Sequence, residues 1–316
     1  MNINQDDKMT YINYSFIIPH HNTPILLLRL INSIPQRDDI EIIVVDDNSD
    51  PNLKPKVSRP DVRIIFIDKE QTKGAGRARN IGMKAARGKW FLFADADDLY
   101  KSGFIDVLDE YKDTDIETLF FNIDSADSQT LMSDRTHRSS VQQRLICQYS
   151  GTKESSDNLL YFAYGPWRKM INSSFVKKYG FEYEEIPKGN DQMFSLMTSY
   201  FTNKWMVDKR ILYTLTYNSK SLTFGNLDKN KCLSDLNILK RRAKFFIYIG
   251  HPEWNWNCAR GHLFQSCLYF CYKTFKKSPQ KGLLYLFYYI TNWRIIKSGA
   301  NYYVDVAKKL SYTKGI

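Results

Sequence analysis

The chain has 316 residues, enough for one large or two modest domains, and its 43% of hydrophobic residues exclude a compositionally disordered protein. Its 45 Lys and Arg against 34 Asp and Glu give a formal charge of +11, which suits an anionic partner such as nucleic acid, an anionic membrane face or a phosphorylated substrate. The five cysteines are odd in number and include no C-x-x-C pair, so we expect neither a disulfide framework nor a zinc site.

The first ten residues lack the apolar core of a signal peptide, and no apolar run approaches the ~20 residues of a membrane span. We therefore expect a protein of the reducing cytoplasm.

The first 125 residues alternate between strand-like and helix-like patterns. Short apolar runs predict strands over 14–18, 41–45, 62–67, 90–94 and 118–123, and helical patterns cover 24–33 and 76–86. Nearly continuous apolar strands separated by helices are typical of an α/β fold whose mostly parallel sheet has helices on both faces. Residues 124–158 are polar and are expected to include a mobile loop, residues 190–200 predict a helix, and the pattern is helical from about Lys229 onward.

Three polar clusters follow the carboxyl ends of predicted strands, at residues 20–22, 46–48 and 95–98. Ligands of such sheets bind beyond the carboxyl ends of the strands. The shared placement predicts a binding site along this edge.

The acidic turn, residues 95–98, carries three carboxylates in four positions, those of Asp95, Asp97 and Asp98. They repel one another unless a cation or hydrogen bonds compensate. A hard cation, Mn²⁺ or Mg²⁺, held by one or two carboxylates and by substrate phosphate oxygens would do so and would neutralise a departing diphosphate. The alternative is a solvated turn in which Asp97 or Asp98 caps a helix near Ser102; the preceding apolar strand favours the metal.

Two further segments contain residues that could bind a nucleotide. Asp47 follows the second strand, where a carboxylate can accept hydrogen bonds from a base or a ribose, although an ordinary turn is an equal alternative. Residues 73–80 open a helix with Gly74, Gly76 and three basic side chains, which favours phosphate. This segment is neither a Walker A loop nor a G-x-G-x-x-G motif, and a capped surface helix competes with the phosphate interpretation.

Together, the runs 16–22, 43–49, 74–82 and 91–98 resemble the family 2 inverting glycosyltransferases with a GT-A fold, of the type that makes bacterial surface polysaccharide and lipooligosaccharide. Order and spacing agree over about the first 100 residues. We predict a GT-A domain over 1–225, with a donor half at about 12–123 and an acceptor half at about 124–225, and a helical extension over 226–316.

The resemblance implies roles for the residues that bind the nucleotide-sugar. Pro19 and His21 would line the base pocket, although His21 departs from the aromatic residue common there, and Asp47 would contact the base, typically uracil. Gly74 lies in the phosphate-favouring segment, and Arg79 would face the diphosphate or pair with a carboxylate.

The acidic turn takes the remaining donor roles: Asp95 would hold the ribose or diphosphate side, Asp97 would ligate the metal, and Asp98 would be an accessory.

Inverting transfer also needs a base that deprotonates the acceptor hydroxyl. The family's acidic pair before a helix matches Asn190 and Asp191, with Asn190 in place of the commoner Glu, so Asp191 is the candidate base. Its alternative role is the N-cap of that helix. Trp167, in a segment that resembles the family's acceptor side, would stack on a sugar, and a core position is equally open.

Residues 254–304 contain no Asp or Glu and combine basic side chains with many aromatics. Helices of this kind can lie at an anionic membrane surface, so our hypothesis is peripheral attachment to the cytoplasmic face of the membrane. A subdomain that packs its aromatics inward and a homodimer interface are the alternatives.

These observations predict a metal-dependent hexosyl- or N-acetylhexosaminyltransferase that moves a sugar from a nucleotide-diphosphate donor, UDP-linked by expectation, to a glycan or lipid-linked glycan acceptor. One alternative is a sugar-1-phosphate nucleotidyltransferase, although its glycine-rich loop is missing after the first strand. Another is a non-catalytic, membrane-associated glycan-binding protein on the same fold. No nucleic-acid partner is expected.

Overall fold

The computed structural model describes residues 11–71, 74–132, 139–186, 189–217, 241–242 and 244–251, with a few single positions between 238 and 286. The chain divides into two compact units, Met1–Ser219 and Lys220–Ile316. The predicted boundaries at 123/124 and 225/226 stay predictions.

An eight-stranded sheet forms the centre of the first unit, in the order β3-β2-β1-β4-β7-β6-β8-β5. β1 to β4 run parallel, β6 and β8 run parallel to each other, and β5 and β7 pair antiparallel with their neighbours. The predicted α/β fold with a mostly parallel sheet is confirmed. The strands are β1 Tyr14–His20, β2 Ile40–Asp46, β3 Val62–Phe66, β4 Trp90–Phe93, β5 Leu99–Tyr100, β6 Thr118–Asp127, β7 Lys169–Asn172 and β8 Trp205–Tyr217.

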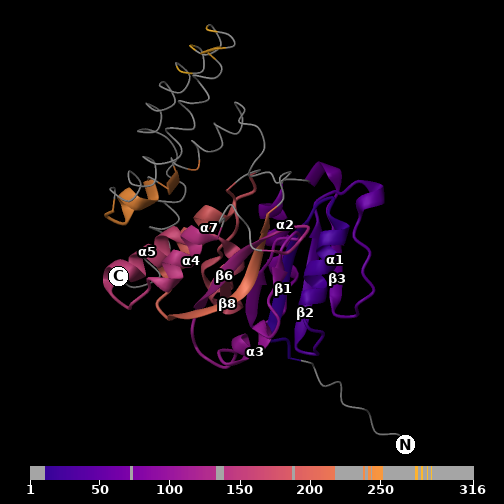
Figure 1. Ribbon diagram of the computed structural model, residues 1–316, viewed down its shortest axis with the longest axis horizontal. Helices are drawn as coiled ribbons and strands as arrows, with labels where there is room; N and C mark the ends of the chain where they lie inside the picture. The colour runs from indigo at the N-terminus through magenta and orange to yellow at the C-terminus, as the bar shows by residue number, and fades with distance from the viewer. Residues whose placement is uncertain are drawn as a thin grey trace, which may run out of the picture. The chain divides into compact units, whose positions relative to one another are not determined.

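Helices cover both faces of this sheet. α1 and α3 contribute to one core cluster, whereas α2 packs against Ile17 on the opposite face, and α4 packs on β6. In Figure 1, β1, β2 and β3 lie at one side of the first unit, and β6 and β8 lie at the other with α4, α5 and α7 beside them. The helices are α1 Pro24–Ser33, α2 Ala75–Ala85, α3 Phe104–Asp109, α4 Ser140–Cys147, α5 Lys153–Phe162, α6 Ser173–Tyr179 and α7 Asp191–Phe201.

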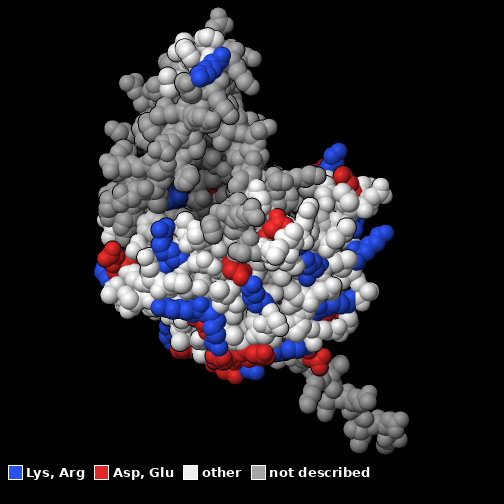
Figure 2. Space-filling view, viewed as in Figure 1, with Lys and Arg blue, Asp and Glu red and all other residues white. Residues whose placement is uncertain are grey.

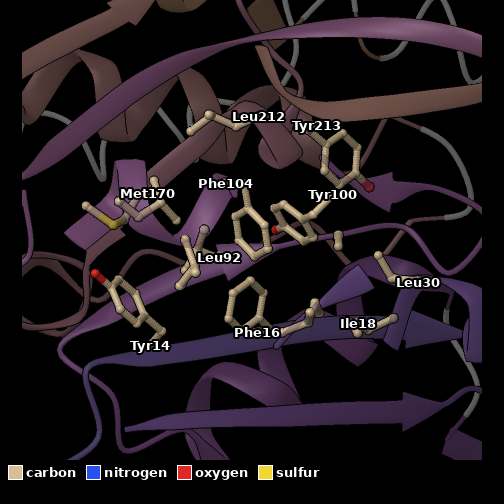
Figure 3. Close-up of a cluster of buried hydrophobic side chains, with 14 of the residues drawn as sticks. Tyr14, Phe16, Ile18, Leu30, Leu92, Tyr100, Phe104, Met170, Leu212 and Tyr213 are labelled. Carbon is tan, nitrogen blue, oxygen red and sulfur yellow. The ribbon is translucent and has the colours of Figure 1, made fainter. Parts of the chain in front are cut away.

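Aromatic rings join distant parts of the chain in the core (Figure 3). The Tyr100 ring stacks on Phe104 at 4.2 Å between centroids and meets Phe16 and Tyr213 edge-on at 5.3 and 5.0 Å. Burying side chains of this size stabilises the fold by roughly 1.5–3 kcal/mol each. The cluster holds β8 against β1, and β8 therefore reaches the edge that carries the acidic turn.

The segment predicted to include a mobile loop also contains two helices that were not predicted, α4 and α5. The loop itself stays a prediction. α4 buries Ile146 and α5 buries Leu159, and the Thr152 side chain caps the backbone N–H of Ser155. A polar sequence hid them because each helix buries only a narrow apolar face.

Of the helical region predicted from Lys229, the described residues up to Tyr248 are helical. Apart from single positions, the basic and aromatic residues 254–304 lie outside the described residues. No helix in the described part has the length and apolar character needed to cross a membrane.

Candidate functional site

The donor-half candidates lie at one edge of the sheet because three parallel strands end there. His20, the last residue of β1, is in register with Asp46, the last residue of β2, and β4 ends two residues before Asp95. The segments that follow these strands therefore meet, as predicted.

Pro19, His21, Asp47 and Gly74 come together at the ends of β1 and β2. The Asp47 N–H donates to the His20 carbonyl at 2.8 Å, and His21 Nδ1 donates to the Asp47 carbonyl at 2.9 Å. The Gly74 N–H donates to Asp47 Oδ2 at 2.9 Å, whereas the buried Oδ1 has no hydrogen-bond partner among the described residues. A carboxylate with one fixed oxygen and one unsatisfied oxygen can accept a hydrogen bond from a ligand.

A buried network that the sequence did not reveal holds this turn. His20 Nε2 accepts the Thr23 N–H at 3.2 Å, so its proton lies on Nδ1 and is donated to Asp46 Oδ1 at 2.7 Å. The Ser49 hydroxyl donates to the same oxygen at 2.5 Å. Because Ser49 bonds to the carboxylate and the outer His20 nitrogen is occupied by main chain, the set is no nucleophilic triad; it fixes the turn that carries Asp47.

Side chains of β8 hold the acidic turn. Asp98 is 3% exposed, and it accepts the Thr216 N–H at 2.6 Å and the Tyr213 hydroxyl at 2.9 Å. Tyr213 in turn accepts the Asp95 N–H at 3.0 Å. Burial, and then the Asp97 and Asp95 carboxylates, raise the pKa of Asp98 well above its ordinary value. Both Asp98 oxygens therefore already accept hydrogen bonds from β8. A contact between Asp98 and a nucleotide-sugar stays a prediction.

The Asp97 backbone is held from two directions. Its carbonyl accepts hydrogen bonds from Arg29 of α1 and from the Thr216 hydroxyl, both at 2.5 Å. The helix-capping alternative is wrong, because α3 begins at Phe104 and its N-cap is Gly103, with no side-chain cap bond.

Arg79 connects the acidic turn to the start of α7. It is 5% exposed and donates to Asp95 Oδ1 at 2.5 Å and to Asn190 Oδ1 at 2.8 Å. Its guanidinium lies 5.2 Å from the centroid of the Tyr183 ring. Although burial opposes the charge, the Asp95 carboxylate raises the pKa of Arg79. Pairing with a carboxylate, one of its two expected roles, is present; a contact with the diphosphate stays a prediction.

Asp191 is the first residue of α7 and is half-buried. The N-cap alternative is therefore wrong by one residue, since the N-cap is Asn190. Burial raises the pKa of Asp191, and the Arg79 charge opposes that rise. A carboxylate whose pKa moves toward neutrality suits a general base.

Trp167 stands near the acidic turn by way of Tyr213. It is half-buried, and its ring lies parallel to that of Tyr213 with centroids 6.1 Å apart. A Cβ on Gly165 would come within 2.4 Å of the indole, so the local backbone is fitted around Trp167. Part of the ring is used in packing, and its acceptor contact stays a prediction.

Two buried cations precede and begin β7, and the sequence analysis assigned neither a role. Arg168 is 0% exposed and donates to the Gln142 side chain and carbonyl. Lys169 is 1% exposed, and its Nζ has no hydrogen-bond partner among the described residues. Burial lowers the pKa of Lys169 to about 7. The only signal was two charged residues beside an apolar strand.

The acidic residues fit a metal that arrives with its substrate. In the described part of the chain, no three His, Cys, Asp or Glu side chains converge to hold an ion. Asp95 has a 36% exposed side chain, and Asp97 is half-buried. Mg²⁺ is usually bound by one or two carboxylates together with substrate phosphates. Asp95 and Asp97 can provide the carboxylates, and a nucleotide substrate would bring the phosphates.

Charge on the visible face gives no separate indication of a partner. Figure 2 shows basic and acidic side chains of the described residues interspersed over the first unit. Among the described residues, this face therefore shows no patch of a single sign that would indicate a charged partner.

The sequence matches the profile of a family described as "Glycosyl transferase family 2" over residues 15–177. Glycosyltransferase GlyG of Streptococcus pneumoniae is 30% identical over 122 residues, which cover 36% of this chain and 40% of that protein. The GalNAc(5)-diNAcBac-PP-undecaprenol beta-1,3-glucosyltransferase of Campylobacter jejuni is 37% identical over 100 residues, covering 30% of this chain and 32% of that protein. The matches thus span two fifths or less of these relatives.

The crystal structure of S. aureus TarS 1–349 in complex with UDP-GlcNAc is similar with a TM-score of 0.57 and 17% identity. The similarity covers 73% of this chain and 66% of that one. At this identity it bears on the fold alone, and it confirms the predicted GT-A architecture.

Proposed function

The chain belongs to glycosyl transferase family 2, and from this membership we propose that it is a metal-dependent, inverting glycosyltransferase. It moves a sugar from a UDP-linked donor to a glycan or lipid-linked glycan acceptor. The observation that carries the proposal is the arrangement of Asp47, Asp95 and Asp97 after the parallel strands β2 and β4, with Asp191 joined to them through Arg79 and Asn190.

The Asp47 carboxylate supports a nucleotide base as ligand. Its buried Oδ1 has no hydrogen-bond partner among the described residues, and it could accept a hydrogen bond from the imide N–H of uracil. Pro19 and His21 lie at the end of the neighbouring strand β1 and would flank the base, and the nearby helix N-terminus at Gly74 favours phosphate. The TarS complex contains UDP-GlcNAc, which agrees with a UDP-linked donor.

Asp97, with Asp95 beside it, would hold Mn²⁺ or Mg²⁺ together with the diphosphate. Such an ion neutralises charge that develops on the leaving diphosphate. The chain's own contribution is to hold the turn rigidly, through the bonds from α1 and β8 described above.

Transfer with inversion is a single displacement at the anomeric carbon. The oxygen of the acceptor hydroxyl forms a bond to the anomeric carbon while Asp191 accepts the hydroxyl proton. At the same time, the bond from that carbon to the diphosphate oxygen breaks. The acceptor is proposed to be lipid-linked because the Campylobacter relative is named for action on a PP-undecaprenol substrate.

Family membership disfavours the nucleotidyltransferase alternative, and the presence of Asp47, Asp97 and Asp191 disfavours a non-catalytic protein. Attachment to an anionic membrane surface and formation of a homodimer stay hypotheses, because both rest on residues 254–304.

Calorimetric titration of the full chain with UDP tests the donor site. UDP should bind in the presence of Mn²⁺ and should lose affinity in chelator or in Asp97→Ala. Asp106→Ala is the matched control, because Asp106 is an exposed carboxylate in the first turn of α3. A UDP affinity that is unchanged both in chelator and in Asp97→Ala would refute the metal site. No UDP binding under any condition would refute the donor site.

A further inference from the structure

Lys169 is a buried cation without a conventional partner. Its side chain is 1% exposed, Nζ makes no hydrogen bond to any described residue, and the contact it does make is with the Phe120 ring, 5.1 Å from the centroid. Burying an ammonium ion is costly unless an opposite charge compensates. A lysine in this position therefore calls for an anion nearby.

The sheet register brings Lys169 beneath the start of α7. Met170 of β7 pairs with Leu92 of β4, so Lys169 is level with Phe93 on the neighbouring strand. The Phe93 ring meets Phe194 of α7 at 5.7 Å. Phe194 comes three residues after Asp191, and residues three apart share one face of a helix. Lys169 and Asp191 thus converge on the same space between the sheet and α7.

Two cations and one carboxylate among the described residues act on the Asp191 carboxylate. The groups that act on its carboxylate are Arg79 of α2, Asp95 of the acidic turn and Lys169 of β7, with the neutral Tyr183 phenol close by. Arg79 donates to Asp95 and to the neutral Asn190 side chain, so it shares its charge between Asp95 and Asp191. Among the described residues, Lys169 is the second cation that acts on the Asp191 carboxylate.

We propose that Lys169 is a positioning residue for the general base, and that its ammonium ion is a counter-charge that, together with Arg79, allows Asp191 to lose its proton inside the site. The base role of Asp191 rests on the proposed function, whereas the charge pair does not. Lys169 acts through Asp191 and need not contact the substrate.

The electrostatics of both residues agree with such a pair. Burial raises the pKa of Asp191 and lowers the pKa of Lys169 to about 7, and each residue's charge opposes the shift of the other. Lys169 therefore still carries charge over the acidic range in which Asp191 ionises. By reciprocity, removal of either charge makes the other harder to maintain.

The direct test is an NMR titration of the full chain labelled with ¹³C at the aspartate carboxyl carbons, with Asp191→Asn to assign the Asp191 signal. Lys169→Met removes the charge at nearly constant volume and should raise the Asp191 pKa by about one to three pH units. Lys169→Arg keeps the charge and should restore a value near wild type. Lys178→Met is the matched control, since Lys178 also lies 5.0 Å from an aromatic centroid, that of Tyr179, but is exposed. An Asp191 pKa in Lys169→Met equal to that in Lys178→Met overturns the proposal.

A second measurement covers the case in which Lys169→Met folds poorly. At neutral pH this substitution should lower Tm in the wild-type background and should lower it much less, or raise it, in Asp191→Asn, where no charge remains to balance. An equal loss of Tm in both backgrounds overturns the pair.

UDP titration in Mn²⁺ separates this inference from the proposed function. Lys169→Met should bind UDP as wild type does, because the donor site is intact. A shifted Asp191 pKa in a chain that binds no UDP would leave the charge pair standing and refute the proposed UDP-linked donor. The reverse pattern would refute the pair alone.

Discussion

Replacing Arg79 by methionine should loosen the connection between the acidic turn and α7. The substitution keeps most of the side-chain volume but removes the ion pair with Asp95, the hydrogen bond to Asn190 and the cation over the Tyr183 ring. Asp95 would then keep the bond of its backbone N–H to Tyr213, and Asn190 would keep the bond of its side-chain amide to the Ile186 carbonyl.

The magnitude follows from the burial of the two partners. Breaking a buried ion pair by removing one partner costs about 3–5 kcal/mol. Arg79 is 5% exposed, but the Asp95 side chain is 36% exposed, so water can solvate part of the carboxylate that is left. We therefore expect a loss of about 2–3 kcal/mol, between the buried and the surface case.

Hydrogen exchange at the amides of β1 and β4 measures this loss in the first unit alone, and exchange should accelerate about 30- to 150-fold. Arg87→Met is the matched control, because Arg87 pairs with Glu41 at 3.0 Å with a 73% exposed side chain. Glu41 also keeps its bonds from Ser15 and the Gly88 backbone, so this control should cost less than about 1 kcal/mol. Equal protection factors for the two variants would refute the reasoning.

Three further outcomes are expected. Burial holds the pKa of Asp98 above its ordinary value, so the folded state keeps this proton to higher pH than the unfolded chain. Its contribution is therefore present at low pH and lost as pH rises, and the Tm advantage of wild type over Asp98→Asn should shrink as the pH is raised; a constant difference contradicts this. Asp191→Asn should lower kcat about 10²- to 10⁴-fold, measured as UDP release, with UDP affinity unchanged; weakened UDP binding would assign Asp191 to the donor site instead. Gly76→Ala places a Cβ 2.0 Å from the Glu184 carbonyl and should destabilise by about 1–3 kcal/mol despite a helix-propensity gain of ~1 kcal/mol, and slower exchange in α2 would contradict it.

The donor half of the fold could be predicted because its signals are local. The helix predicted over 24–33 is α1, and the predicted strands fall on β1 to β4 and β6 to within a few residues. A buried strand of a parallel sheet is apolar on both faces and therefore stands out in the sequence. By contrast, β5, β7 and β8 were not predicted, since their formation depends on pairing with strands distant in the chain. The helix α6 was not predicted either, and it is only seven residues long.

The site divides in the same way. Asp47, Asp95 and Asp97 follow apolar strands and could be found by position, and Asp191 came from the family resemblance. Tyr213 could not be found, because its importance lies in two bonds to the acidic turn across 115 and 118 residues. Lys169 was missed for a similar reason: its environment is built by β4, β6 and α7, none of which is its neighbour in sequence.

The contacts that hold the acidic turn in place come from both the predicted donor half and the predicted acceptor half of the first unit. β8 supplies Tyr213 and Thr216 to the turn, and its register with β6 shifts at an irregularity beside Asn122. A one-residue slip of β8 would move the Tyr213 side chain and the Thr216 side chain each to the other face of the sheet. The geometry of the acidic turn therefore depends on a strand from the predicted acceptor half, while Arg79, from the predicted donor half, holds the start of α7. Each predicted half thus positions candidate residues of the other, and we expect neither half to keep the arrangement when expressed alone.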